Sequence, residues 1–160
     1  MRTPVPFFVS YAHLDSRIAT AFINLLTEQL EPSERYDYAL WRDTELLVGD
    51  RWHDEIVQAL DACQLGLLLI SPAFLASDYI TRHELPRFVG NGAKPIIPVM
   101  LKTVNMHRHD LKGLDQYQIF RLDNVKPFAD CTTDATRRRF AEGLFGQIEH
   151  RLDWLFGNRS

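Results

Sequence analysis

Residues 65–85 read LGLLLISPAFLASDYITRHEL, an apolar run followed by a proline-containing loop and a short helical pattern. Residues 65–70 are apolar at every position, which is typical of a central strand in a parallel sheet that is covered on both faces. Glu84 lies in the helical pattern, at the rim of its apolar stripe. A carboxylate just past a buried strand is well placed for chemistry, although an ordinary solvated helix residue fits the pattern too. Pro86 predicts that this helical segment is short and kinks or restarts there.

Strand and helix patterns alternate along the rest of the chain. Apolar runs predict further strands at residues 7–11, 38–41, 95–101 and 117–122. Helical stripes begin after a cap at Asp15 or Ser16, at Trp52, and after a cap at Asp134. This alternation predicts one α/β domain over residues 1–160, with a flavodoxin-like five-stranded parallel sheet of order 2-1-3-4-5 and helices on both faces. Two prolines place the strand at 95–101 near an edge.

The flavodoxin-like order places a topological switch point between the first and third strands, where ligands bind at the carboxyl ends. Several polar or aromatic residues follow the strands at this point: Ser10, Tyr11, His13, Trp41, Asp43, Ser71 and Glu84. Structural explanations also fit some of them, because Tyr11 and Trp41 suit strand-end core packing and Asp43 suits a loop cap. The predicted architecture nevertheless brings Glu84 to the crevice, where its carboxylate would be available for chemistry.

The composition is that of an ordinary globular protein. The 160 residues are 46% hydrophobic, and 18 basic against 21 acidic residues give a net charge of -3. This balance does not favour binding of nucleic acid or of an anionic membrane. Cys63 and Cys131 lack the CxxC spacing of a zinc site or a disulfide framework, which suits a reducing compartment. Because we find neither a signal-peptide pattern nor an apolar run near ~18 residues, we expect a soluble, cytoplasmic protein.

Several motifs of nucleotide-binding and hydrolytic proteins are absent from the sequence. The chain has no GxGxxG after the first strand, no GxxxxGK[ST] and no GxSxG, which argues against a Rossmann dinucleotide site, a P-loop NTPase and an α/β-hydrolase. The third strand ends at Ser71 instead of an aspartate, which argues against a phospho-accepting receiver. His107 and His109 form an HxH pair beside Asp110, but a fourth ligand is not evident, so we predict no metal site.

Three short boxes, in the right order and at the right spacing, resemble those of Toll/interleukin-1 receptor (TIR) domains. They are FFVSYA at residues 7–12, LWRD at 40–43 followed by Gly49 and Trp52, and LLISP at 68–72 followed by Tyr79 and Glu84-Leu85. Together they span about residues 6–101. The style of the boxes is similar to that of bacterial members of the family, and the remaining strand–helix units fit the same fold.

The resemblance implies an enzyme that consumes NAD⁺, with Glu84 as the catalytic residue and no cofactor beyond the substrate. By the same resemblance, Tyr11 and His13 line the ribose and phosphate side, Asp43 shapes the crevice, and Trp52 stacks on the nicotinamide. The remaining residues of the predicted binding set are Ser10, Trp41 and Ser71. The resemblance also implies self-association as the activating step and a role in signalling or defence, and it leaves open whether the product is linear or cyclic ADP-ribose.

Two other functions stay open from the sequence. Some TIR domains are non-catalytic scaffolds that act through homotypic contacts, here with residues 44–50 as the main contact surface. A nucleotide-sensing α/β module without turnover is a third possibility. Glu84 in one crevice with His13 and Trp52 distinguishes the enzyme, because a pure scaffold needs no such set. A TIR domain of this length is often a piece of a longer chain, whose other domains and activating signal the sequence does not reveal.

Overall fold

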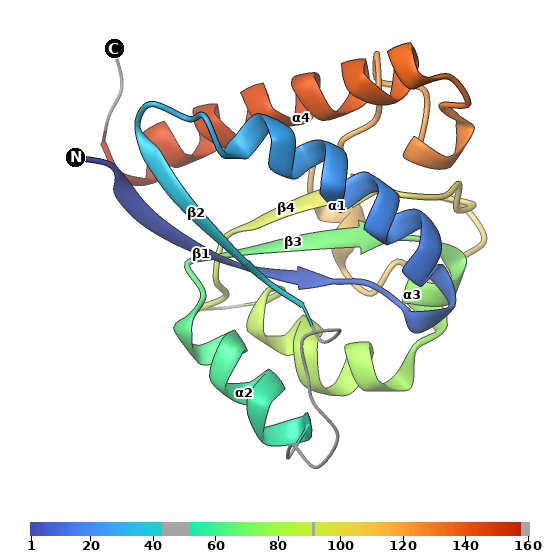
Figure 1. Cartoon of the computed structure of the whole chain (residues 1–160). Coiled ribbons are helices and arrows are strands. Elements are labelled where there is room, and N and C mark those ends of the chain that lie inside the picture. Colours follow the sequence, from blue (N-terminus) through green and yellow to red (C-terminus); the bar gives the residue numbers. More distant parts are fainter. Residues whose placement is uncertain (43–51, 91, 158–160) are drawn as a thin grey trace.

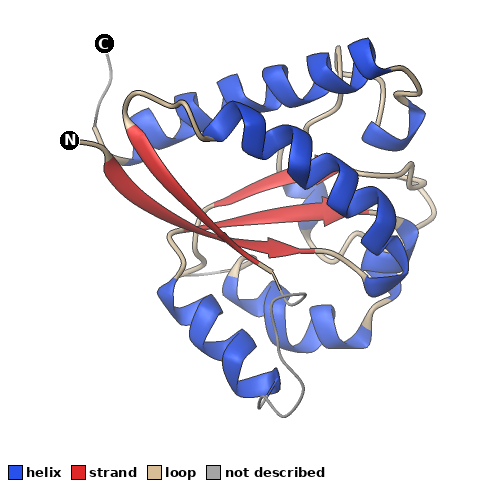
Figure 2. Ribbon diagram, in the orientation of Figure 1, coloured by secondary structure: helices blue, strands red, loops and turns tan. Residues whose placement is uncertain are grey.

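A computed structural model of the chain places a four-stranded parallel sheet between two layers of helices, as Figure 2 shows. The structure describes residues 1–42, 52–90 and 92–157. The strands lie in the order β2-β1-β3-β4 and are β1 (Thr3–Ser10), β2 (Tyr36–Trp41), β3 (Leu65–Ile70) and β4 (Ile96–Met100). The predicted flavodoxin-like α/β arrangement is therefore confirmed for these four strands.

The helices cover the two faces of the sheet in pairs of segments. Helices α1 (Ser16–Leu30) and α4 (Asp134–Leu155) lie side by side on one face (Figure 1). Helix α2 (Trp52–Ala62) and the helical segment of residues 72–87 cover the other face. None of the described helices is both long and apolar enough to cross a membrane.

The start of α4 differs by one residue from the predicted cap. Thr133, and not Asp134, is the N-cap, and its Oγ1 accepts a hydrogen bond from the Thr136 N–H at 3.1 Å. Thr136 Oγ1 accepts from the Thr133 N–H in return, at 3.2 Å, which completes a capping box. Asp134 is then the first helical residue, where its negative charge interacts favourably with the helix dipole.

Side chains of β1 and β3 alternate between two separate apolar cores, as the pleat of a strand requires. Phe7 and Val9 point into the core beneath α1 and α4, whereas Phe8 points into the core beneath α2. All six residues of β3 are buried, as the uninterrupted apolar run predicted. The segment with Glu84 therefore follows a strand that is buried on both faces.

Gly66 is the point where β3 has no room for a side chain. A Cβ atom there would lie 2.5–2.8 Å from three ring atoms of Phe88, which is fully buried. Gly66→Ala is therefore expected to lower the free energy of unfolding by about 2 kcal/mol through overpacking. Urea denaturation measures this, with Gly146→Ala on α4 as the control, because a Cβ at Gly146 meets nothing within 4 Å. Equal stability of the two variants would contradict the prediction.

The fifth strand predicted at residues 117–122 is not formed as a strand. Of residues 117–122, all of which the structure describes, only Phe120 makes a parallel bridge, to Val99 of β4. The Phe120 N–H donates to the Pro98 carbonyl at 2.8 Å, and the Met100 N–H donates to the Phe120 carbonyl at 3.0 Å. The expected five-stranded sheet is thus corrected to four strands and a one-residue bridge.

The hydrogen-bonding groups on either side of this bridge explain why it is so short. Pro98 has no N–H, so the ladder lacks the donor that would extend it toward residue 118. On the other side, the Leu122 N–H donates to the Lys126 carbonyl at 2.8 Å within a tight turn and is not available to β4. As its prolines predicted, β4 lies at an edge of the four-stranded sheet.

Two tyrosines of β2 attach this outer strand to α4. The Tyr38 hydroxyl donates to Glu149 Oε2 at 2.5 Å, and the Tyr36 hydroxyl donates to Asp153 Oδ1 at 2.6 Å. Ser33 Oγ also donates to Glu149 Oε2, at 2.6 Å. Burial of the hydroxyl and its hydrogen bond to the Glu149 carboxylate raise the pKa of Tyr38 far above its ordinary value of 10.0.

The raised pKa of Tyr38 predicts a loss of stability in alkaline solution. The folded protein binds the phenolic proton more tightly than the unfolded chain, so this stabilisation is complete below pH 10 and declines as the unfolded tyrosine ionises above it. Urea unfolding of the protein and of Tyr38→Phe at pH 8 and at about pH 10.5 measures the effect. The difference in the free energy of unfolding between the protein and Tyr38→Phe should be smaller at the higher pH. An equal difference at the two pH values would contradict the prediction.

Candidate active site

A crevice of about 420 Å³ opens at the carboxyl ends of β1 and β3, where the sheet order predicted a ligand site. Its walls come from the β1–α1 connection, the start of α2 and the segment that follows β3. Four of the predicted site residues line it together: Tyr11, His13, Trp52 and Glu84. The crevice is therefore a candidate active site built from stretches that are far apart in the sequence.

Glu84 provides a carboxylate in this crevice. It is only 7% exposed, and so more deeply buried than the predicted position at the rim of an apolar stripe. Ser10, the last residue of β1, donates a hydrogen bond from Oγ to Glu84 Oε1 at 2.5 Å. A small hollow behind the carboxylate is lined by Phe8, Val9, Tyr11, Trp41 and Ile56. Glu84 thus lies between an open crevice and a mainly apolar wall.

The local backbone explains why Glu84 is buried. Residues Ile80–Glu84 form a π-helical turn, in which the Leu85 N–H donates to the Ile80 carbonyl. This wider turn displaces Glu84 from the place that regular α-helical spacing predicted, and π turns often occur at functional sites. A 3₁₀ turn over Leu85–Arg87 follows and includes Pro86, so the predicted break in the helix is confirmed.

The aromatic rings of Trp52 and Tyr79 form one rim of the crevice, and two imidazole rings contact Tyr79. Trp52 is 46% exposed, so it is not a core residue, and its ring makes a T-shaped contact with the Tyr79 ring at a centroid distance of 4.8 Å. His53 Nδ1 lies 2.9 Å from the Tyr79 hydroxyl, and the His83 ring is 4.6 Å from that of Tyr79. The predicted set did not include Tyr79, although its place five residues before Glu84 was a usable signal.

Asp15 holds the β1–α1 connection, which forms another wall of the crevice. It ends the 3₁₀ turn His13–Asp15, is 2% exposed, and its Oδ1 lies 2.7 Å from Lys102 Nζ. Ser71 Oγ donates to Asp15 Oδ2 and accepts from the Phe74 N–H at 3.0 Å, as the N-cap of α3 (Pro72–Ala76). Asp15 therefore ties together the loops that follow β1, β3 and β4.

The other predicted site residues lie outside the crevice or outside the described chain. Ser71 is fully buried beneath the crevice wall, where it holds Asp15 and α3. Trp41 stacks on Phe8 at a centroid distance of 5.2 Å and faces the hollow behind Glu84. Asp43 and the loop of residues 44–50 fall outside the described residues.

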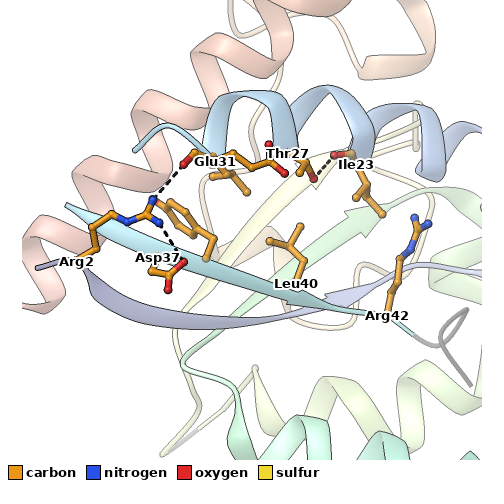
Figure 3. A pocket seen from close by; sticks show the side chains of 9 residues that line it. Arg2, Ile23, Thr27, Glu31, Asp37, Leu40 and Arg42 are labelled. Carbon is orange, nitrogen blue, oxygen red and sulfur yellow. Dashed lines mark hydrogen bonds and ion pairs between the residues drawn. The ribbon is translucent and has the colours of Figure 1, made fainter. Parts of the chain in front are cut away.

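Figure 3 shows a different hollow, of about 340 Å³, between α1 and β2. The guanidinium group of Arg2 lies at one end, 3.6 Å from Asp37 and donating to the Glu31 carbonyl at 3.1 Å. Arg42 lies at the other end, and Leu40 belongs to the apolar part between them. The arginine at one end is thus held by groups of the protein itself, and none of the predicted site residues lines this hollow.

A parallel sheet of order 2-1-3-4 defines a flavodoxin-like domain, and a carboxylate-bearing crevice lies at its switch point. A family model described as a TIR domain matches residues 7–136, and this chain belongs to the TIR domain family. The uncharacterized protein y4lF of Sinorhizobium fredii is 29% identical over 104 residues. The aligned part is 62% of this chain and 31% of the relative, so the chain spans about a third of that protein.

Proposed function

We propose that this domain cleaves NAD⁺ between nicotinamide and ribose, and that self-association activates it in signalling or defence. The observation that supports this proposal is the buried Glu84 carboxylate, which lines a crevice and accepts a hydrogen bond from Ser10. The TIR family includes NAD⁺-cleaving enzymes, and TIR domains commonly self-associate. The reaction uses NAD⁺ as substrate and needs neither a metal ion nor a further cofactor.

The chemistry suits a single carboxylate. When the bond between ribose C1′ and the pyridine nitrogen breaks, its electron pair neutralises the positively charged ring, so nicotinamide leaves without being protonated. Positive charge then develops on the ribose, and Glu84 stabilises this oxocarbenium-like transition state electrostatically. Addition of water at C1′, with loss of a proton, gives ADP-ribose, whereas attack by a nitrogen of the adenine gives a cyclic product.

The remaining crevice residues suit the other parts of the substrate. Trp52 and Tyr79 present aromatic surfaces at the rim, where the nicotinamide ring stacks. His13 and Tyr11 line the wall nearer the β1–α1 connection and contact the ribose and phosphate. We place the reaction in the cytoplasm, because Cys63 and Cys131 are both free thiols.

A non-catalytic scaffold is the second candidate function. Leu14 is 89% exposed and Trp52 is 46% exposed, and both line the crevice; apolar side chains that are exposed close together suit a protein–protein contact. In this alternative, homotypic TIR contacts transmit the signal and the crevice turns over no substrate. The loop predicted to carry these contacts, residues 44–50, lies outside the described residues.

Nicotinamide release from NAD⁺ by the purified domain tests the proposal. The assay is run at increasing protein concentration and with a crowding agent, while sedimentation records assembly and circular dichroism confirms folding. Turnover that rises with assembly and disappears in Glu84→Ala supports the enzyme. A domain that assembles and yet releases no nicotinamide is a scaffold, and turnover that persists in Glu84→Ala places the catalytic site elsewhere.

A further inference from the structure

A groove of about 720 Å³ lies where a fifth strand would complete the sheet. Its floor and walls are the first half of β4, the segment of residues 116–121 and one side of α4. Aromatic and apolar side chains contribute much of the lining, among them Ile96, Tyr117, Ile119 and Trp154. Trp154 is 51% exposed, so the groove presents a large apolar ring at the surface.

The sheet edge in this groove has hydrogen-bonding capacity left. The Gly66 N–H donates to the Pro95 carbonyl at 3.0 Å and the Leu101 N–H donates to the Ile70 carbonyl at 2.9 Å. In residues 95–101, the backbone N–H and carbonyl groups of odd-numbered residues therefore point toward β3. The backbone groups of even-numbered residues point away from β3, and Phe120 forms hydrogen bonds there with the Pro98 carbonyl and the Met100 N–H. Within the described part of the chain, the outward N–H and carbonyl of Ile96 have no partner.

An unpaired strand edge in a recessed place favours an added strand. Ile96 lines the groove although only 5% of the residue is exposed, so its outward backbone groups are accessible only from within the groove. Backbone groups in such places are nearly always hydrogen-bonded in native proteins, and an open edge readily pairs with another chain. The position of Ile96 therefore points to an extended polypeptide as the occupant of the groove.

The charge of the groove limits which polypeptide fits. Arg121, His150 and Arg151 line it, and none of its lining residues carries a carboxylate. Two carboxylates that follow these residues closely in the sequence are engaged elsewhere: Asp123 pairs with Arg139 at 3.1 Å, and Asp153 binds the Tyr36 hydroxyl at 2.6 Å. Positive charge around an apolar groove is complementary to an acidic segment.

We propose that this groove binds an extended acidic segment of a partner protein, which adds as a strand along β4 at Ile96. Alternate side chains of the segment enter the apolar part of the groove, and the carboxylates between them meet the cationic lining. This interaction does not depend on the crevice or on NAD⁺. It assigns a partner-binding role to the sheet edge opposite β2.

The test uses a fluorescein-labelled peptide of alternating glutamate and valine, six residues long, and measures its binding by fluorescence anisotropy. Saturable binding is expected, weaker at high salt, and about tenfold or more weaker for Arg121→Glu/Arg151→Glu. Arg17→Glu/Arg138→Glu is the matched control, because it changes the net charge equally at two exposed residues outside the groove. Circular dichroism confirms that both double variants fold.

Two further probes separate strand addition from general charge attraction. A peptide of the same sequence with N-methylated backbone at alternate residues should bind poorly, because it lacks the donors that pair with Ile96. A lysine–valine peptide should not bind. The proposal is overturned if the two double variants weaken binding equally, if the methylated peptide binds as well as the parent, or if single-stranded DNA binds the groove more tightly than the acidic peptide.

Discussion

Replacing Glu84 with glutamine is expected to lower the rate of NAD⁺ cleavage about a thousandfold while leaving the fold intact. Glutamine has nearly the same volume and keeps an oxygen that can accept the Ser10 hydrogen bond, so packing in the crevice is conserved. The substitution removes only the negative charge, which is the part of the side chain that stabilises the oxocarbenium-like transition state. The loss should appear in kcat, because this interaction strengthens as positive charge develops on the ribose.

Nicotinamide release over a range of NAD⁺ concentrations measures this effect, and thermal unfolding confirms that the variant is as stable as the parent. Ser10→Ala provides a graded comparison, since it removes the hydrogen bond that orients the carboxylate but retains the charge. We expect its rate to fall about tenfold, far less than that of Glu84→Gln. If Glu84→Gln keeps a tenth or more of the activity, the carboxylate is not the catalytic group.

Asp15→Ala is expected to lower the free energy of unfolding by about 3 kcal/mol. The substitution removes a buried carboxylate that interacts with Lys102 and with the Ser71 hydroxyl. It leaves that hydroxyl, which is fully buried, without its acceptor. This value is at the lower end of the range for breaking a buried ion pair, because the Lys102 side chain is 41% exposed and its ammonium group can be hydrated in the variant. Nicotinamide release should fall too, since Asp15 holds the turn that carries His13.

Urea denaturation of Asp15→Ala, beside Asp37→Ala as a matched control, tests this expectation. Asp37 also pairs with a basic residue, Arg2 at 3.6 Å, but its side chain is 63% exposed. The control should therefore change stability by no more than about 0.5 kcal/mol. Similar losses in the two variants would show that Asp15 contributes no more than an ordinary surface ion pair.

Much of the fold was predictable because it follows from local patterns. The wholly apolar residues 65–70 predicted β3 with the bounds that the structure has, and helical spacing predicted α1, α2 and α4. The order of the first four strands followed from the alternation of strands and helices and the handedness of their connections. Glu84 was assigned to the crevice on the same basis, before its contacts were known.

Other features depend on contacts between distant residues and were not predictable from local patterns. The fifth strand fails because of Pro98 on the neighbouring strand and the turn at Leu122, and not because its own sequence is unsuited to a strand. Asp15 or Ser16 was predicted to cap α1, and Asp15 is its N-cap residue, but the Asp15 side chain makes no cap hydrogen bond and interacts instead with Lys102 and Ser71. In both cases the hydrogen-bonding partners are supplied by residues elsewhere in the fold, and local sequence patterns do not specify them.

The α/β class, the central place of β3, the TIR resemblance and the candidacy of Glu84 follow from the amino-acid sequence alone, because periodicity and short motifs act over neighbouring residues. Three features depend on the folded arrangement: how deeply Glu84 is buried, which aromatic rings share its crevice, and the contact of Ser71 with Asp15 outside the crevice. These properties depend on the distances between residues up to 74 positions apart, as for Ser10 and Glu84. Such distances are set only when the two apolar cores pack on either face of the sheet.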